Sequence, residues 1–146
     1  MIVFCDTSAL MKLYVREAHS DWTDGQVRSA SRCLVSQITW AEMCAALAFK
    51  QRSQQIDGEA MAFAVARLRA EWNGFVRLAV DAPLITDAGA LAQRHALRAY
   101  DSVQLASARK AQELAGAALH FCCFDKALNQ AAMALGITTL TPPSET

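Results

Sequence analysis

The sequence lacks the features that would indicate a membrane protein or a disulfide-stabilised secreted protein. No apolar run approaches the ~20 residues that a membrane-spanning helix needs. The five cysteines are odd in number and form no Cys-x-x-Cys pair, so we expect no disulfide framework. The first residues carry no basic segment, and Asp6 interrupts the apolar run that a signal peptide needs. We therefore expect a soluble, cytoplasmic protein with no membrane partner.

An excess of charge of either sign is missing as well. The chain has 14 basic and 14 acidic side chains, which gives a formal net charge of zero. Bulk electrostatics therefore gives no support to nucleic-acid binding, although a bound divalent metal could supply local positive charge. The hydrophobic fraction of 53% and the length of 146 residues indicate one globular domain with a substantial core.

Familiar catalytic and nucleotide-binding motifs are also missing. The chain contains no G-x-x-x-x-G-K-[ST], G-x-G-x-x-G or G-x-S-x-G pattern. Its three histidines, His19, His95 and His120, are scattered and lack the spacing of metal ligands. There is no internal repeat, linker or low-complexity segment. Any chemistry has to come from other side chains.

What the chain does contain is a regular alternation of strand and helix patterns. Short apolar runs predict strands at 2–5, 33–38, 75–80, 119–124 and 137–140. Helical patterns occupy 8–16, a segment after Ser20, 43–50, 59–72, 84–96, 101–114 and 126–135. This order predicts an α/β fold, a helix-rich three-layer α/β/α sandwich around a central parallel sheet of four to five strands.

Four acidic residues stand at the junctions between these elements. Asp6 and Asp125 each end a strand and begin a helix, Glu42 lies in the first turn after the second strand, and Asp101 begins the helix before the fourth strand. The carboxyl ends of parallel strands meet at one edge of the sheet, where ligands of open α/β sheets bind. We therefore expect Asp6, Glu42 and Asp125 at one edge, and Asp101 can join them if its helix begins there.

Each acid also has a purely structural explanation. Acids in the first turn of a helix complement its dipole, and Asp101 and Asp125 could be N-caps. Glu42 could close a capping box with Thr39. Thr7 and Ser8 suit the N-cap of the first helix before any role in a site. Asp6 is harder to explain in this way, because a carboxylate at the end of a buried strand is costly unless it is paired or metal-bound.

A bound cation would explain the whole set of acids. Four carboxylates at one edge repel one another and raise each other's pKa values, and a metal ion reverses that effect. Oxygen ligands favour Mg²⁺ or Mn²⁺ over zinc.

Four segments of the chain resemble the PIN-domain ribonucleases, and within them the VapC-type toxins of prokaryotic toxin–antitoxin pairs. The segments are Phe4-Cys5-Asp6-Thr7-Ser8-Ala9-Leu10, Ser36-Gln37-Ile38-Thr39-Trp40-Ala41-Glu42-Met43, Leu97-Arg98-Ala99-Tyr100-Asp101-Ser102-Val103-Gln104-Leu105-Ala106 and Phe121-Cys122-Cys123-Phe124-Asp125-Lys126-Ala127-Leu128. Their order and spacing match along essentially the whole chain. One departure is Cys123, which stands where the family often has Thr or Ser.

The resemblance implies a single nuclease domain over residues 1–140 followed by a frayed tail at 141–146. It implies a Mg²⁺- or Mn²⁺-dependent endoribonuclease whose catalytic, metal-binding residues are Asp6, Glu42, Asp101 and Asp125. Thr7 or Ser8 could orient a water or the phosphate, and Lys12, Arg98 and Lys126 could hold flanking phosphates. The implied partners are an RNA substrate, a small cognate antitoxin and a second copy of the chain in a homodimer.

Two other functions compete with this one. A PIN-like module could bind RNA or a protein without cutting, although such a module has no need to keep four clustered acids. A phospho-acceptor or phosphatase could use Asp6 as nucleophile, but the second Asp expected two residues later is Ser8.

Overall fold

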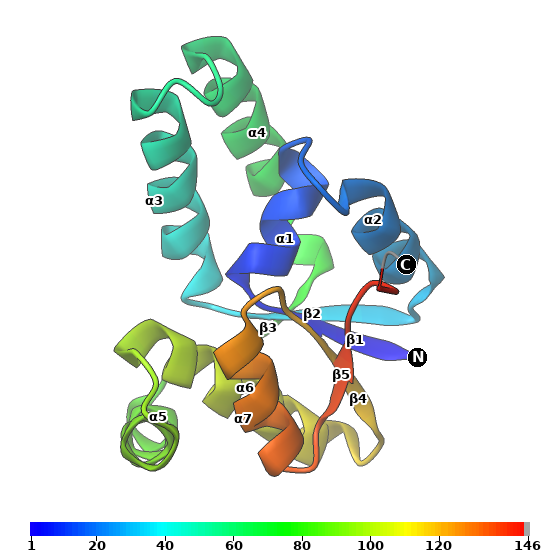
Figure 1. The fold of residues 1–146 in the computed structure, drawn as a ribbon, viewed down its shortest axis with the longest axis vertical. Helices are drawn as coiled ribbons and strands as arrows, with labels where there is room; N and C mark the ends of the chain where they lie inside the picture. Colours follow the sequence, from blue (N-terminus) through cyan, green and yellow to red (C-terminus); the bar gives the residue numbers. More distant parts are fainter. Residues whose placement is uncertain (145–146) are drawn as a thin grey trace.

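The computed structural model describes residues 1–144 and is built around a sheet of five parallel strands (Figure 1). The strands are β1 (Ile2–Cys5), β2 (Arg32–Ser36), β3 (Val76–Leu78), β4 (Leu119–Cys122) and β5 (Thr138–Leu140). Their order across the sheet is β3-β2-β1-β4-β5, so β1 lies in the middle, between β2 and β4. The predicted parallel α/β fold is confirmed.

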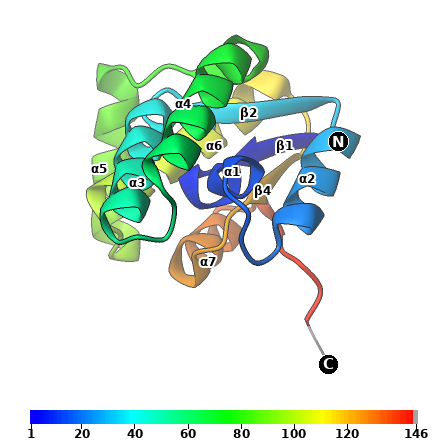
Figure 2. The ribbon, with the colours of Figure 1, turned by 90° about the horizontal axis from the view of Figure 1, so that it is seen from above.

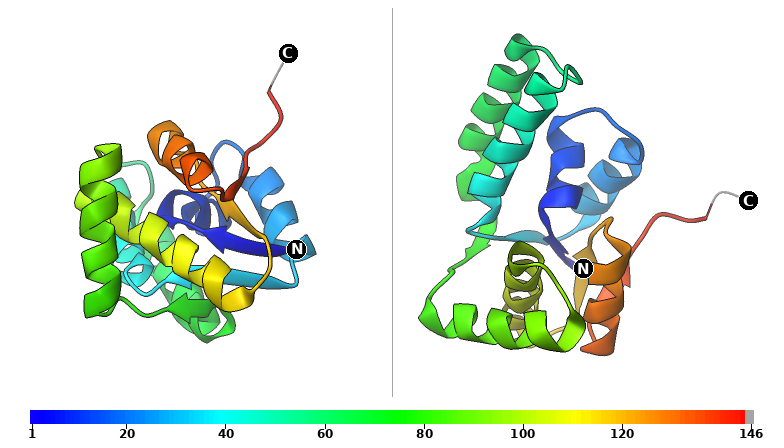
Figure 3. Two further views of the ribbon diagram at one scale, coloured as in Figure 1. Left: turned by 90° about the horizontal axis from the view of Figure 1, so that it is seen from below. Right: turned by 60° about the vertical axis from the view of Figure 1, so that its left-hand side comes forward.

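Helices cover both faces of this sheet. They are α1 (Thr7–Tyr14), α2 (Ser20–Ser29), α3 (Thr39–Arg52), α4 (Gly58–Glu71), the short 3₁₀ helix η1 (Trp72–Gly74), α5 (Ala82–His95), α6 (Ala99–Ala115) and α7 (Lys126–Ala134). Helices α1–α4 lie on one face and α5–α7 on the other (Figures 1 and 2). The view from below in Figure 3 shows α5, α6 and α7 across the second face. No helix in this part of the chain is long and apolar enough to cross a membrane.

The alternation of side chains along β1 connects the sheet to both layers. Val3 and Cys5 belong to the hydrophobic cluster under α1, α3 and α4, whereas Phe4 belongs to the cluster under α5–α7. All three side chains are buried, because successive side chains of a strand point to opposite faces and helices cover both faces of this sheet. The continuous apolar run at 2–5 is therefore what a central strand with two covered faces requires.

Several element ends differ from the sequence-based predictions. The strands predicted at 33–38 and 119–124 stop two residues early, at Ser36 and Cys122, because the chain turns there towards the next helix. The helix predicted from Asp101 begins at Ala99, so Asp101 lies in its first turn and is not the N-cap. Ser20 is likewise the first residue of α2, and His19 takes its N-cap position. Of the tail predicted at 141–146, residues 145–146 lie outside the described residues.

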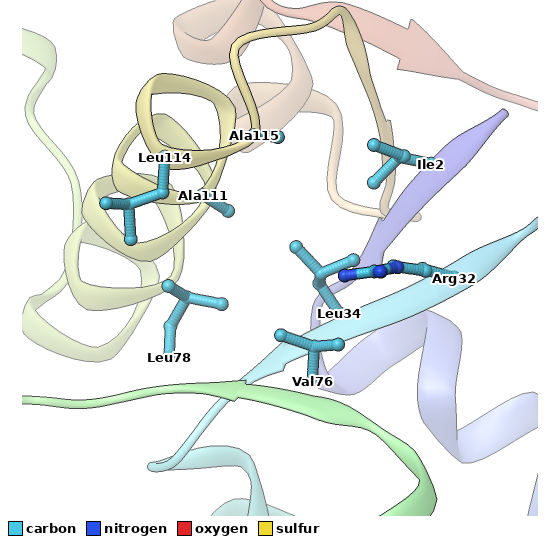
Figure 4. A pocket seen from close by; sticks show the side chains of 8 residues that line it. All are labelled: Ile2, Arg32, Leu34, Val76, Leu78, Ala111, Leu114 and Ala115. Carbon is cyan, nitrogen blue, oxygen red and sulfur yellow. The ribbon is translucent and has the colours of Figure 1, made fainter.

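A cavity of about 400 Å³ opens between strands β1, β2 and β3 and the last turns of α6 (Figure 4). It is lined by Ile2, Arg32, Leu34, Val76, Leu78, Ala111, Leu114 and Ala115. None of the four junction acids lines it. The cavity lies at the amino ends of the strands, so the candidate site has to be sought at the opposite edge of the sheet.

Candidate active site

Asp6 is the buried acid at the centre of the carboxyl edge. It follows β1 and is the N-cap of α1: its Oδ1 accepts hydrogen bonds from the Ala9 amide at 3.0 Å and from Ser8 Oγ at 2.7 Å. The prediction that Thr7 or Ser8 would cap this helix is therefore wrong. Asp6 takes the cap because it is the last extended residue before the helix.

The surroundings of Asp6 disfavour its charged form. The residue is 4% exposed, and burial raises the pKa of its carboxyl from the ordinary 3.8 to about 6. Hydrogen bonds from Ser8 and Cys123 oppose this shift, while the negative charge of Glu42 adds to it. Asp6 is thus a carboxylate that would gain from a nearby cation.

Glu42 is held beside Asp6 by side chains from two other helices. Its Oε1 accepts hydrogen bonds from Thr7 Oγ1 at 3.0 Å and from Gln104 Nε2 at 2.7 Å. The predicted capping box is wrong: α3 has Ile38 as N-cap without a side-chain hydrogen bond, and the Thr39 hydroxyl accepts from Gln104 at 2.9 Å. Tertiary contacts across the edge therefore replace the local cap.

Asp125 is the N-cap of α7, as predicted, and its Oδ1 accepts from the Leu128 amide at 2.9 Å. The chain just before it is tied to Asp6, because the Phe124 amide donates to Ser8 Oγ at 3.0 Å. Cys123 contributes as well: its sulfur accepts from the Asp125 amide at 3.3 Å. Burial and the charge of Asp6 raise the pKa of the Cys123 thiol, and this thiol donates to the Asp125 carbonyl at 3.7 Å.

Asp101 lies one helical turn before Gln104 in α6, which places its backbone next to the Glu42 network. Its carboxylate, however, pairs with Arg98 Nε at 3.1 Å. The side chain of Arg98 is 82% exposed, so this ion pair stands largely in solvent. The structure thus brings the Asp101 segment to the edge but turns its carboxylate onto a local partner.

The four acids share one edge of the sheet without forming a closed set of ligands. No three Asp, Glu, His or Cys side chains within residues 1–144 are grouped so that they could hold one metal ion. Glu42 lies close enough to Asp6 to raise the pKa of its carboxyl, and neither has an ion-pair partner in the described chain. The bonds from Ser8 and Ala9 converge on Oδ1 of Asp6. Those to Glu42 converge on Oε1, which leaves Oε2 for a ligand. Two hard oxygen donors without a basic partner fit Mg²⁺ or Mn²⁺.

A groove of about 560 Å³ runs from Glu42 along α3. It is lined by Thr7, Ile38, Ala41, Glu42, Ala45, Ala46, Phe49 and Tyr100. Because Thr7 and Glu42 form part of its wall, the acidic edge is accessible to a ligand. Lys12, considered above as a phosphate-binding residue, is instead paired with Glu17 at 3.1 Å, and its side chain is 11% exposed.

The sequence-based site omitted Gln104 altogether. Its position three residues after Asp101 places it on the same side of α6, and that spacing was the available signal. A glutamine in a helix is usually a solvated surface residue, so the pattern alone did not single it out.

Comparisons with known proteins identify the family to which this fold belongs. The PIN domain model matches residues 3–132. Two proteins of Mycobacterium tuberculosis, Ribonuclease VapC45 and Ribonuclease VapC49, are each 32% identical over 107 residues, which covers 73% of this chain and 74% of theirs.

Solved structures support the fold at lower identity. FitAcB from Neisseria gonorrhoeae is similar with a TM-score of 0.67 and 16% identity, over 96% of this chain and 97% of that one. A toxin–antitoxin complex from Klebsiella pneumoniae gives a TM-score of 0.64 and 17% identity, over 99% of this chain and 100% of that one. The chain therefore belongs to the PIN-domain family and resembles, within it, the VapC-type ribonucleases.

Proposed function

We propose that this protein is a metal-dependent endoribonuclease, the toxin component of a type II toxin–antitoxin pair, with Asp6, Glu42, Asp101 and Asp125 as its metal-binding and catalytic residues. The observation that carries the proposal is that buried Asp6 lies within electrostatic reach of Glu42 at the carboxyl edge and that neither acid has a basic partner in residues 1–144. The 32% identity to two VapC ribonucleases supports RNA as the substrate.

The residues around the pair have distinct tasks in this proposal. Ser8 and the Ala9 amide fix Oδ1 of Asp6, and Thr7 with Gln104 fixes Oε1 of Glu42. Each acid thereby presents its other oxygen in a set direction. Preorganised ligands of this kind reduce the cost of assembling a charged site when the substrate arrives.

A divalent cation, Mg²⁺ or Mn²⁺, would supply positive charge for the scissile phosphate and lower the pKa of an attacking water. Asp6 and Glu42 would hold it, and Asp101 and Asp125 would complete the set. Asp101 would have to leave Arg98 to take part. That step costs little, since exposed ion pairs contribute roughly 0.2–1 kcal/mol.

The role of the acid pair is tested by Asp6→Asn. The substitution keeps the size and the helix cap but removes the charge, so we expect RNA cleavage to fall by at least about 100-fold with the fold intact. Cleavage of cellular RNA is mapped with both proteins in Mg²⁺ and in Mn²⁺. Asp21→Asn is the matched control, because Asp21 is exposed and pairs only with Arg16 at the surface. Undiminished cleavage by the Asp6 variant would contradict the proposed site.

One observation favours the competing function, a PIN-like module that binds RNA or protein without cutting. Within residues 1–144 the acids do not form a ready group of three ligands. Thermal unfolding with increasing Mn²⁺ separates the two functions. A nuclease should be stabilised by Mn²⁺, and the effect should be absent in Asp6→Asn, whereas an inert module should not respond.

We extend the proposal to the cellular setting. A small antitoxin is the expected partner, since the Klebsiella relative in structure is a toxin–antitoxin complex. We further propose that the protein forms a homodimer and is located in the cytoplasm. We also propose that the chain divides into a nuclease domain at 1–140 and a tail at 141–146. Co-expression with the product of a short reading frame directly upstream would test the partner.

A further inference from the structure

Gln104 is a buried amide in the first half of α6 that contacts both of the other helices at the acidic edge. It is 2% exposed, although glutamine is rarely buried. Its Nε2 lies 2.7 Å from Glu42 Oε1, 2.9 Å from Thr39 Oγ1 and 3.2 Å from Thr7 Oγ1. One side chain therefore connects α6 to the start of α1 and the start of α3.

The orientation of this amide follows from its neighbours. An ionised carboxylate can only accept, so the group facing Glu42 has to be the amide nitrogen. Thr7 gives its own hydroxyl hydrogen to Glu42, and its oxygen is therefore the acceptor towards Gln104. With Nε2 fixed in this way, Oε1 has to point elsewhere.

That second atom, Oε1, is buried and has no hydrogen-bond partner within residues 1–144. A buried amide oxygen without a partner is costly, and such groups in native proteins are satisfied by water or by a ligand. The amide thus donates to Glu42 while its own oxygen stays without a partner, which indicates that the carboxylate sets its orientation.

We propose that Gln104 is a positioning residue for the reaction: its amide nitrogen sets the direction of Glu42. The inference rests on the proposed nuclease function for its kinetic consequence. The contact between Gln104 and Glu42 does not depend on that function and is testable separately.

The kinetic test compares Gln104→Met with wild type. Methionine fills a similar volume but has neither amide atom, so Glu42 loses its shortest hydrogen bond. Loss of a residue that orients a ligand costs about 10- to 100-fold in activity or metal affinity. We expect kcat to fall by that factor while KM for RNA stays within roughly threefold, because the binding surface is unchanged. The control is Gln112→Met, two turns further along α6, where the side chain bonds only the Leu119 amide.

A double-mutant cycle with Glu42→Gln shows whether Gln104 acts through Glu42. In the Glu42→Gln background, Gln104→Met should lower kcat by less than about threefold, since residues that act as a unit are not additive. The Gln112 variant should have the same small effect in both backgrounds. A full 10- to 100-fold loss in the Glu42→Gln background would overturn the positioning role, as would unchanged kcat in Gln104→Met alone.

Exchange of the two side chains tests the contact without any cleavage assay. Gln104→Glu places two carboxylates together and should lower the melting temperature of the metal-free protein. Adding Glu42→Gln restores an amide–carboxylate pair with the partners exchanged, and should recover most of that loss. No recovery would overturn the contact even if Gln104→Met failed to fold. If wild-type protein cut no RNA but the exchange recovered stability, the nuclease function would fail and the contact would stand.

The orientation of Glu42 as a metal ligand is tested by isothermal titration with Mn²⁺ in the absence of RNA. Gln104→Met should weaken Mn²⁺ binding by about tenfold, whereas Gln112→Met should leave it unchanged. Unchanged Mn²⁺ affinity in Gln104→Met would contradict the role of Gln104 in orienting Glu42 for the metal.

Discussion

The acidic edge has two halves that are stabilised in different ways. Asp6 is buried, and Ser8, which donates to it, also accepts from the Phe124 amide. Glu42 accepts from side chains of α1 and α6. Asp101 and Asp125 instead bond within their own helix regions, to Arg98 and to the Leu128 amide. The first half is connected by hydrogen bonds to other elements, while the second is satisfied locally.

This difference explains why the acids share an edge without forming a set of three ligands. Asp101 has to give up its ion pair with Arg98 before it can join a common cation. The same difference separates the acids energetically: Asp6 carries a charge that burial disfavours, and Asp125 supports the helix that it begins. Residues kept for function often reduce stability, and Asp6 fits that pattern.

The largest expected effect on stability is a gain from Asp6→Asn. Because the folded pKa of Asp6, about 6, lies above its ordinary 3.8, the folded state binds the proton more tightly than the unfolded state. The contribution of Asp6 to the free energy of unfolding is therefore highest below about pH 4, falls as pH rises through this window, and is lowest above pH 6. Asparagine carries no charge and therefore avoids this loss of stability at high pH. We expect the metal-free Asp6→Asn variant to be more stable than the wild type by about 1–3 kcal/mol at pH 7.5.

Urea unfolding at pH 7.5 and at pH 4 measures this gain, which should shrink towards the lower pH. Asp57→Asn is the control, since Asp57 caps α4 through the Ala60 amide at 2.7 Å and asparagine caps equally well. Equal stability of wild type and the Asp6 variant at both pH values would contradict the difference between the two halves.

Asp125 should show the opposite behaviour, with a smaller effect. Asp125→Ala removes the cap of α7 and should cost about 1 kcal/mol, whereas Asp125→Asn keeps the cap and should cost less than about 0.5 kcal/mol. Both variants lose the charge, so both should cleave RNA more slowly if Asp125 is a ligand. Full activity of Asp125→Asn would assign this residue to the helix cap alone.

The sequence predicted the architecture well because the fold depends on patterns that are local. The apolar run at 2–5 predicts a central strand, and every residue from Val3 to Cys5 is buried in the structure. Asp125 before a helical pattern and Gly136 after it predict a helix between them, and α7 lies there. The parallel order then brings the ends of β1, β2 and β4 to one edge without further information.

The partners of the acids were less predictable, because they depend on distances between elements. Thr39 and Glu42 fit a capping box by spacing, yet Gln104, 65 residues after Thr39, competes for the hydroxyl and the carboxylate. Arg98 and Asp101 are close in the chain, but only the early start of α6 at Ala99 places both on its first turn. Local patterns thus placed the backbone, and long-range hydrogen bonds decided the direction of the side chains.

The smallest expected effect concerns the pair that holds Asp101 away from the other acids. Arg98→Ala removes the partner of Asp101 and one positive charge near the edge, so Mn²⁺ should bind more tightly. The gain should not exceed about fivefold, because an exposed pair contributes roughly 0.2–1 kcal/mol. It should also shrink at high salt, which already screens the pair in wild type.

Arg28→Ala breaks a similar exposed pair with Asp24 on α2 and should leave Mn²⁺ affinity unchanged. Titration of both variants with Mn²⁺ at low and high salt measures this difference. Equal Mn²⁺ affinity in the two variants would mean that Asp101 does not move to the cation. The second half of the edge would then have a structural role only.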